Sequence, residues 1–189
     1  SSRRHGAIER DSLGPDARRL GSQAEKHGPH HSPDQPTTPF GYYSAEHRAL
    51  IMNIGLGGGT LVHEIVHPYV QADFPGAPPW LNEGLASLYE QCQIQEGRIR
   101  GLVNWRLPHL QRAVQENTLV PLRDLTAMAG DEFYRRYGLP YAESRYLCMF
   151  LQEQGKLVAF YKAFRTAAAA KDSAAKDATG AATLEAVLG

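Results

Sequence analysis

Large hydrophobic residues recur every three or four positions in several stretches that follow Gly59. This is the spacing of an α-helix with one buried face, and it predicts helices over residues 60–72, 79–93, 105–115, 141–154 and 158–164. Thr60 is placed to cap the first of these helices. Pro68 lies inside that helix, so we expect the helix either to bend there or to end near Ala72.

Shorter apolar runs predict strands. Tyr42-Tyr43 and residues 50–54 flank a polar stretch at 45–48, which we expect to form the turn between two strands. Residues 97–103 predict a further short strand or hairpin between glycines. Helices accompanied by a small sheet predict an α+β fold.

The same pattern divides the chain into three parts. Residues 1–39 hold few large aliphatic side chains and many glycines, prolines, serines and charges, so we expect a disordered polar tail. Residues 40–165 carry the predicted helices and strands and form the predicted folded domain. Alanine dominates residues 166–189, which could form a weak helix or a loose linker.

Charge and composition narrow the classes of partner. Lys and Arg together number 20, as do Asp and Glu, so no excess of positive charge favours nucleic acid or an anionic membrane. No apolar run is long enough to span a membrane, and no apolar signal-peptide core follows Arg3 and Arg4. Cys92 and Cys148 have no metal-ligand spacing and could either pair or stay free.

The strongest chemical signal is H-E-x-x-H, formed by His63, Glu64 and His67. Residues four apart share a helix face, so both imidazoles can bind one metal ion. A catalytic zinc site needs two such ligands, an open position for water, and a carboxylate that accepts the proton of that water; Glu64 is suited to be this general base. The alternative is an ordinary amphipathic helix whose histidines are satisfied by neighbours. Its apolar side would consist of Leu61, Val62, Ile65 and Val66.

A second motif offers the third ligand that such a site requires. Pro79 suits the first turn of the next helix, in which Leu81, Leu85 and Leu88 recur at helical spacing and Glu83 falls on a different face. The turn between the helices, residues 74–79, is rich in proline and glycine, which allows the chain to return. Glu83 is therefore the candidate third ligand, with a solvated surface carboxylate as the alternative.

H-E-x-x-H followed by W-L-N-E-G-L-A resembles the gluzincin metallopeptidases, most closely the bacterial peptidase-MA-like group. The resemblance implies a zincin-like fold and one zinc ion held by His63, His67 and Glu83, with Glu64 as general base. It also implies a peptide or protein substrate and favours a periplasmic or secreted location. Similar proteins continue to a further helix, which would make the C-terminal segment of this chain a truncated copy.

One position departs from the resembling enzymes. Asn82-Glu83 resembles the N-E pair of thermolysin-like enzymes, in which an aspartate four residues after the glutamate ligand supports a zinc histidine. This chain has Ser87 at that position. The side chain that supports His63 or His67 must therefore come from elsewhere.

Peptide hydrolysis also needs a donor to the oxyanion that develops on the attacked carbonyl. The segment Y-A-E-S-R-Y-L-C-M-F-L-Q-E-Q-G resembles the third block of the peptidase-MA-like group, and in this clan a downstream tyrosine or histidine supplies the donor. Tyr141 is our candidate, with Tyr134, Tyr137 and Tyr146 as rivals and simple packing as the alternative role. In the same family a strand edge before the zinc helix lines the substrate cleft, and residues 51–54 would be that edge.

Two further features have plainer interpretations. The glycine-rich stretch 55–59 lacks G-K-[ST], so we expect a flexible loop that lies close above the metal rather than a phosphate site. Five other histidines are expected to be exposed polar residues rather than ligands: His5, His27, His30, His31 and His109.

These observations predict zinc-dependent hydrolysis of peptide bonds by a metal-activated water. A rival hypothesis is a catalytically inactive binding module that keeps the zincin-like fold. A third is a purely structural zinc site, which would make folding depend on the metal.

Overall fold

The computed structural model describes residues 42–44, 49–51, 58–136, 138–172 and 176–189. The chain divides into two compact units, residues 1–53 and 54–189. In the first unit β1 (Tyr42–Ser44) pairs antiparallel with β2 (Ala49–Ile51), which confirms the predicted pair of strands. The predicted tail at 1–39 and residues 52–57 of the expected strand edge and glycine loop lie outside the described residues.

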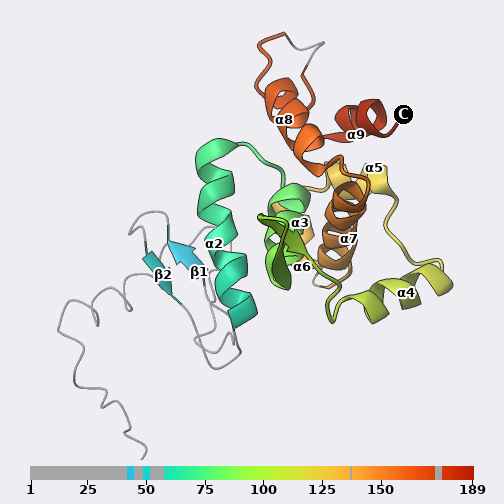
Figure 1. Cartoon of the computed structure of the whole chain (residues 1–189). Helices are drawn as coiled ribbons and strands as arrows, with labels where there is room; N and C mark the ends of the chain where they lie inside the picture. The colour runs from blue at the N-terminus through green and yellow to red at the C-terminus, as the bar shows by residue number, and fades with distance from the viewer. Residues whose placement is uncertain (1–41, 45–48, 52–57, 137, 173–175) are drawn as a thin grey trace, which may run out of the picture. The chain divides into compact units, whose positions relative to one another are not determined.

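The second unit consists mainly of helices (Figure 1). In chain order its elements are α2 (Gly58–Asp73), α3 (Pro79–Tyr89), β3 (Cys92–Gln95), β4 (Arg98–Gly101), α4 (Leu107–Gln115), α5 (Leu122–Ala127), α6 (Gly130–Arg135), α7 (Leu139–Glu153), α8 (Leu157–Ala168) and α9 (Ala181–Leu188). Strands β3 and β4 form a separate antiparallel hairpin. The described fold is thus mixed α+β and rich in helix.

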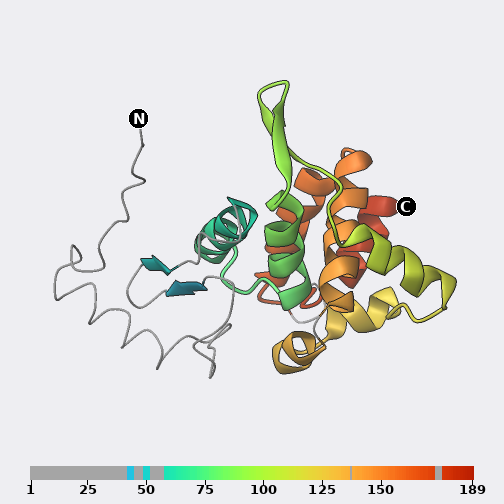
Figure 2. The same ribbon diagram turned by 90° about the horizontal axis from the view of Figure 1, so that it is seen from below.

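Helix α3 is the central element of this unit, with α2 packed on it from one side and α7 from another (Figures 1 and 2). Trp80, Leu81 and Leu88 of α3 are fully or almost fully buried. A Cβ on Gly84 would lie 2.8 Å from the Ser144 carbonyl oxygen of α7. The glycine next to Glu83 is therefore required by the close approach of two helix backbones.

The β3–β4 hairpin projects from the end of α3 (Figure 2). Glu96 and Gly97 form its turn with positive φ angles of 51° and 72°, as a two-residue hairpin turn requires. At its base Leu102 donates its N–H to the Gln91 carbonyl over 2.7 Å. The Gln152 side chain of α7 bonds both the N–H and the carbonyl of Gly101, over 2.8 and 3.0 Å. The hairpin is therefore tied to the core at its base.

A buried guanidinium joins these elements. Arg145 of α7 has no exposed surface. Its Nε donates to the carbonyl of Ser87 over 3.0 Å, and its Nη2 donates to the carbonyls of Leu88 and Leu102. Arg145 thus satisfies carbonyl groups at the C-terminal end of α3, which have no partner within the helix, and fixes the return of the chain after β4.

The C-terminal residues are part of the core. Leu184 of α9 is buried, and the indole N–H of Trp80 donates to the Thr179 carbonyl over 2.8 Å. The Asp177 carboxylate accepts the N–H of Gly180 over 2.8 Å and both the N–H and the hydroxyl of Thr183 over 2.9 and 2.7 Å. Helix α8 runs through the expected domain boundary at residues 165 and 166, and α9 packs against α8.

Helices were predicted at all the sites of α2, α3, α4, α7 and α8, but several details of the prediction were wrong. Helix α2 begins before Thr60, so Thr60 is not its cap; its end at Asp73, beyond Pro68, agrees with the expected end near Ala72. Helix α3 ends at Tyr89 instead of residue 93, because residues 92–95 pair with β4. Helix α6 was not predicted. Cys92 and Cys148 are both free thiols.

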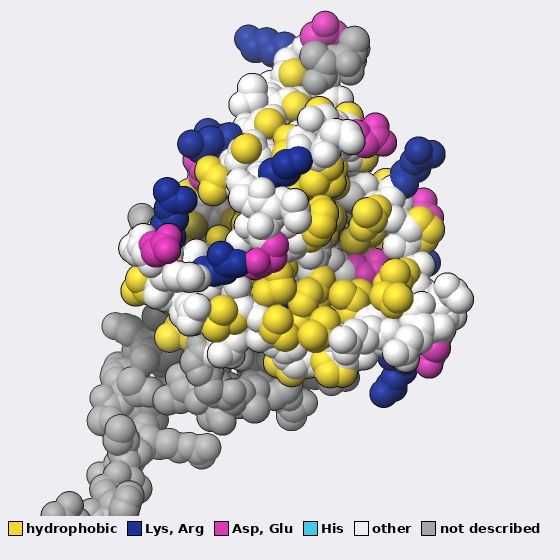
Figure 3. Space-filling model, turned by 45° about the vertical axis from the view of Figure 1, so that its right-hand side comes forward, with side chains coloured by type: hydrophobic (Ala, Val, Ile, Leu, Met, Phe, Trp, Pro, Cys, Tyr) yellow, Lys and Arg dark blue, Asp and Glu magenta, His cyan; other side chains and the backbone are white. Residues whose placement is uncertain are grey.

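On the face that Figure 3 presents, basic and acidic side chains are mixed, and neither kind forms a large patch. Apolar side chains gather in the middle of this face, with basic and acidic side chains scattered around them. The described helices include none that is long and apolar enough to cross a membrane.

Candidate metal centre

Helix α2 buries polar residues of the H-E-x-x-H motif and leaves part of its apolar side exposed. His63 and Glu64 are only 7% and 4% exposed, whereas Leu61 and Ile65 are 38% and 39% exposed. The ordinary amphipathic helix of the alternative hypothesis would instead bury its aliphatic side. A helix that buries a histidine and a glutamate while exposing aliphatic residues is unlike an ordinary amphipathic helix, because burying polar groups costs free energy unless they have partners.

These inward side chains meet Glu83 of α3. The Nε2 atom of His63 lies 3.2 Å from Glu83 Oε2, and the Nε2 atom of His67 lies 3.9 Å from the same oxygen. Glu83 itself is 1% exposed, so it is not the solvated surface carboxylate of the alternative hypothesis. The structure brings together all three residues that the sequence predicted as ligands.

The donor atoms fit a divalent ion such as zinc. The candidate ligand atoms of His63, His67 and Glu83 all lie within 4.8 Å of one another. Ligand atoms about 2.0–2.2 Å from a tetrahedral zinc ion are about 3.3 Å apart. The 3.2 Å separation of His63 Nε2 from Glu83 Oε2 matches this value, and the 3.9 Å separation of His67 Nε2 from the same oxygen is longer. Two imidazole nitrogens and one carboxylate are also the donor set of many hydrolytic zinc sites.

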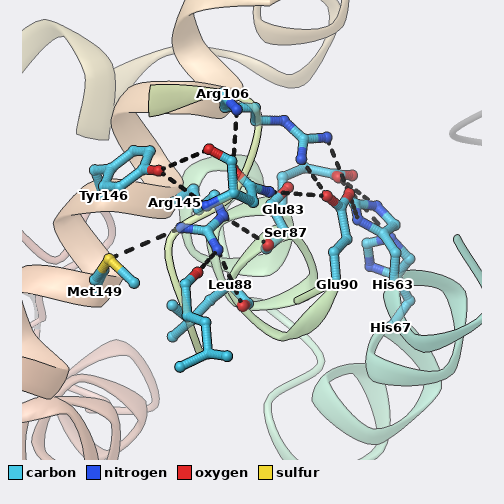
Figure 4. Close-up of polar contacts among 12 residues, drawn as sticks. His63, His67, Glu83, Ser87, Leu88, Glu90, Arg106, Arg145, Tyr146 and Met149 are labelled. Carbon is cyan, nitrogen blue, oxygen red and sulfur yellow. Dashed lines mark hydrogen bonds and ion pairs between the residues drawn. The ribbon is translucent and has the colours of Figure 1, made fainter. Parts of the chain in front are cut away.

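The Nδ1 nitrogen of each histidine makes a hydrogen bond to a side chain other than Glu83. His67 Nδ1 lies 3.1 Å from Asn82 Oδ1, next to Glu83 on α3. His63 Nδ1 lies 2.9 Å from Glu90 Oε1, just after the end of α3 (Figure 4). Both contacts direct the Nε2 atoms towards Glu83, and they identify the supporting side chains that the sequence left unassigned.

Glu90 is in turn held by the segment that follows β4. Arg106 donates from both terminal nitrogens to the two carboxylate oxygens of Glu90, with Nη2 at 2.9 Å from Oε1. The side-chain amide of Asn104 donates to Glu90 Oε2 over 3.3 Å. A Cβ on Gly59 would lie 3.1 Å from the Glu90 carbonyl oxygen, so the first turn of α2 lies close against this end of α3.

The electrostatic environment of His63 is strongly acidic. Burial alone would lower the pKa of His63, but its hydrogen bonds to Glu83 and Glu90 outweigh this effect and raise the pKa to about 10. Burial opposes ionisation of Glu90, yet the bonds from His63 and Arg106 prevail and lower its pKa. The two carboxylates thus favour a positive charge at this place, which the proton on His63 supplies when no metal ion is bound.

Tyr134 of α6 also reaches this group. Its hydroxyl donates to Glu83 Oε1 over 3.2 Å, while burial and the nearby Glu83 charge raise the pKa of its phenol. Tyr141, our first candidate for the oxyanion donor, is buried with its ring 5.0 Å from that of Phe133. The hydroxyl of Tyr146 is bonded to the backbone of Asn104, and residue 137 is outside the described residues.

Sequence reasoning missed Glu90 and Arg106. One signal was available for Glu90, since it follows Glu83 by seven residues and therefore lies two turns along the same face of an α-helix. No spacing rule could have singled out Arg106, which reaches Glu90 only after the chain has passed through the β3–β4 hairpin. His109 is exposed, as expected for a surface residue.

No protein-family model, no curated protein and no solved structure matches this chain. The resemblance to gluzincins therefore rests on the two sequence motifs.

Proposed function

We propose that this protein is a zinc-dependent peptidase of the gluzincin type with a zincin-like fold, in which one metal ion is bound by His63, His67 and Glu83. The observation that carries the proposal is the convergence of two imidazole nitrogens on one buried carboxylate oxygen, at 3.2 and 3.9 Å. The hydrogen bonds of Asn82 and Glu90 support it, because ligand histidines are commonly oriented in this way.

A bound zinc ion would make a water molecule more acidic and polarise the carbonyl group of a peptide bond. The chain's own residues then have separate tasks. Glu64 follows His63 directly on α2, and we propose that it accepts the proton of the attacking water and later passes it to the leaving amine. Its burial, at 4% exposure, favours this role because proton transfer to a carboxylate is more effective where bulk water is excluded.

A tyrosine hydroxyl is proposed to donate to the oxyanion. Tyr141 is the candidate from the sequence, and Tyr134 is favoured by the position of its hydroxyl, 3.2 Å from the Glu83 carboxylate. Tyr134→Phe and Tyr141→Phe separate these two residues: the variant that lacks the true donor should lose about 10²–10³-fold in kcat while keeping its metal.

The test of the whole proposal is metal content together with hydrolysis. Wild type, Glu83→Ala and Glu64→Gln would each be offered zinc, dialysed, and measured by elemental analysis and with a library of unstructured peptides. We expect one zinc per chain in wild type, loss of zinc in Glu83→Ala, and retained zinc without hydrolysis in Glu64→Gln. Glu153→Ala, which changes an exposed glutamate of α7, is the matched control and should behave as wild type.

The rival hypotheses give different results. An inactive binding module would hold zinc and cleave no peptide in the library. A structural site would unfold when a chelator removes the metal. A wild-type protein that takes up no zinc would refute the proposal at its first step.

A further inference from the structure

Both carboxylate oxygens of Glu90 accept hydrogen bonds from neighbouring side chains. Its Oε1 atom accepts from His63 Nδ1 and from Arg106 Nη2, both at 2.9 Å. Its Oε2 atom accepts from Arg106 Nη1 and from the Asn104 amide. A carboxylate bonded on both oxygens in this way cannot rotate without breaking several hydrogen bonds.

The clamp around Glu90 is itself fixed. The Asn104 side-chain oxygen accepts the backbone N–H of Arg106 over 3.0 Å. The Arg106 guanidinium lies over the ring of Trp105, 4.2 Å from its centroid. The side chains of Arg106 and Glu90 are only 12% and 14% exposed. Because the pair is largely shielded from water, it is stronger than an ion pair on an open surface.

Ser87 does not supply this support. Its side chain is fully buried, and its hydroxyl has no hydrogen-bond partner among the described residues. Ser87 occupies the position where thermolysin-like enzymes carry a supporting aspartate, but its side chain is buried where α3 packs against its neighbours. Glu90 lies three residues further along the chain and reaches His63 from there (Figure 4).

We propose that Glu90, held by Arg106 and Asn104, is the positioning residue of this metal centre. It accepts a hydrogen bond from the Nδ1–H of His63, which leaves the lone pair of Nε2 directed at the metal position beside Glu83. The positive charge of Arg106 offsets the charge of Glu90, so the carboxylate orients the imidazole without removing its Nδ1 proton. This inference deepens the proposed function and rests on it only for the presence of a metal ion.

A purely structural role for the pair makes different predictions. If Glu90 and Arg106 only joined α3 to the segment after β4, their loss would lower stability and leave metal binding by the folded protein unchanged. A positioning role requires a change in the affinity for metal and in the ligand field of the bound ion. Orienting partners of ligand histidines typically contribute about 10- to 100-fold to metal affinity.

The experiment measures metal affinity in the full chain. Metal-free wild type and Glu90→Gln would be titrated with Zn²⁺ in competition with a chromophoric chelator, and with Co²⁺ to record its visible absorption. Glutamine keeps the size of the side chain but removes its charge. We expect Glu90→Gln to bind Zn²⁺ about 10- to 100-fold more weakly and to shift the Co²⁺ bands. Circular dichroism of each variant checks that the chain is folded.

Three further variants make the result specific. Ser87→Ala and Glu153→Gln should bind both metals as wild type does, since the first removes a buried hydroxyl and the second an exposed Glu–Arg pair. Arg106→Met should weaken Zn²⁺ binding about 10-fold, because it frees the Glu90 carboxylate to rotate. If Glu90→Gln does not fold, Arg106→Met decides the question by the same titration.

The outcomes separate this proposal from the proposed function. Wild-type affinity and an unchanged Co²⁺ spectrum in folded Glu90→Gln would overturn the positioning role and leave the peptidase proposal in place. Zinc binding that depends on Glu90, without hydrolysis of any peptide, would refute the peptidase and support the positioning role. A wild type that binds neither metal would overturn both.

Discussion

Replacing Arg145 by methionine should destabilise the protein by about 3 kcal/mol. Methionine has a similar length and keeps most of the packing, but it leaves the carbonyls of Ser87, Leu88 and Leu102 without their donor. Each buried carbonyl left unpaired costs about 1–3 kcal/mol. The variant no longer buries a cation, whose desolvation costs several kcal/mol, and this offsets part of the loss. A net loss of about 3 kcal/mol is a large share of a typical stability of about 5–15 kcal/mol.

The assay is urea unfolding of the metal-free protein, followed by circular dichroism and by tryptophan fluorescence. Trp80 is buried in the core, whereas Trp105 is exposed near Glu90, so fluorescence reports on more than one region. The control is Arg100→Met. Arg100 is about 40% exposed and pairs with Glu153 at the surface, so its loss should change the free energy of unfolding by less than about 1 kcal/mol.

A loss below about 1 kcal/mol for Arg145→Met, equal to that of the control, would refute this reasoning. It would mean that the three carbonyls find other partners or water once the guanidinium is gone. The two probes should also give coincident transitions if the second unit unfolds cooperatively.

Three further predictions concern other parts of the chain. Burial raises the pKa of the Cys148 thiol to about 12, so a thiol reagent at pH 8 should label Cys92 in the folded protein and Cys148 only on unfolding, as mass spectrometry of the labelled peptides would show. Burial opposes ionisation of Asp177, but hydrogen bonds led by those from Thr183 prevail and lower its pKa. The folded pKa is therefore below the unfolded value, and the stability that Asp177 provides is present above about pH 4 and lost as the pH falls through the folded pKa. Asp177→Ala should lower the free energy of unfolding by about 1 kcal/mol at neutral pH in urea titrations and by less at pH 3; equal losses at both pH values would contradict this. Gly180→Ala places a Cβ 2.8 Å from an aromatic carbon at a φ of 85°, so its melting temperature should fall by several degrees, and an unchanged value would contradict the packing described here.

The sequence predicted the helices well where a single face is apolar over three turns, as in α7. It failed where tertiary contacts decide the structure. Residues 92–95 continue the helical spacing of α3, but they pair with residues 98–101, and that pairing outweighs local preference. The short helix α6 is only six residues long, which leaves too few apolar positions to show a period.

The candidate site was predictable to the extent that its members share a helix. His63, Glu64 and His67 lie within one turn and a half, and Glu83 follows a recognisable motif. The inward direction of His63 and Glu64 follows from the metal-site hypothesis, whereas the exposure of Leu61 and Ile65 could not be predicted, because hydrophobicity alone would place them inside. Contacts between side chains far apart in the sequence, such as that of Glu90 with His63, depend on how two helices are placed and have no local signature.

The candidate metal ligands come from two helices joined by the short connection at residues 74–78. An ion held by His63 and His67 on α2 and by Glu83 on α3 would therefore act as a reversible cross-link between them. Its binding free energy would add to the stability of their packing, since the unfolded chain does not present these donors together. A chelator that removes the ion would then also loosen the packing of α2 on α3. The rate at which the metal-free protein binds zinc again would thus also measure how readily α2 docks on α3.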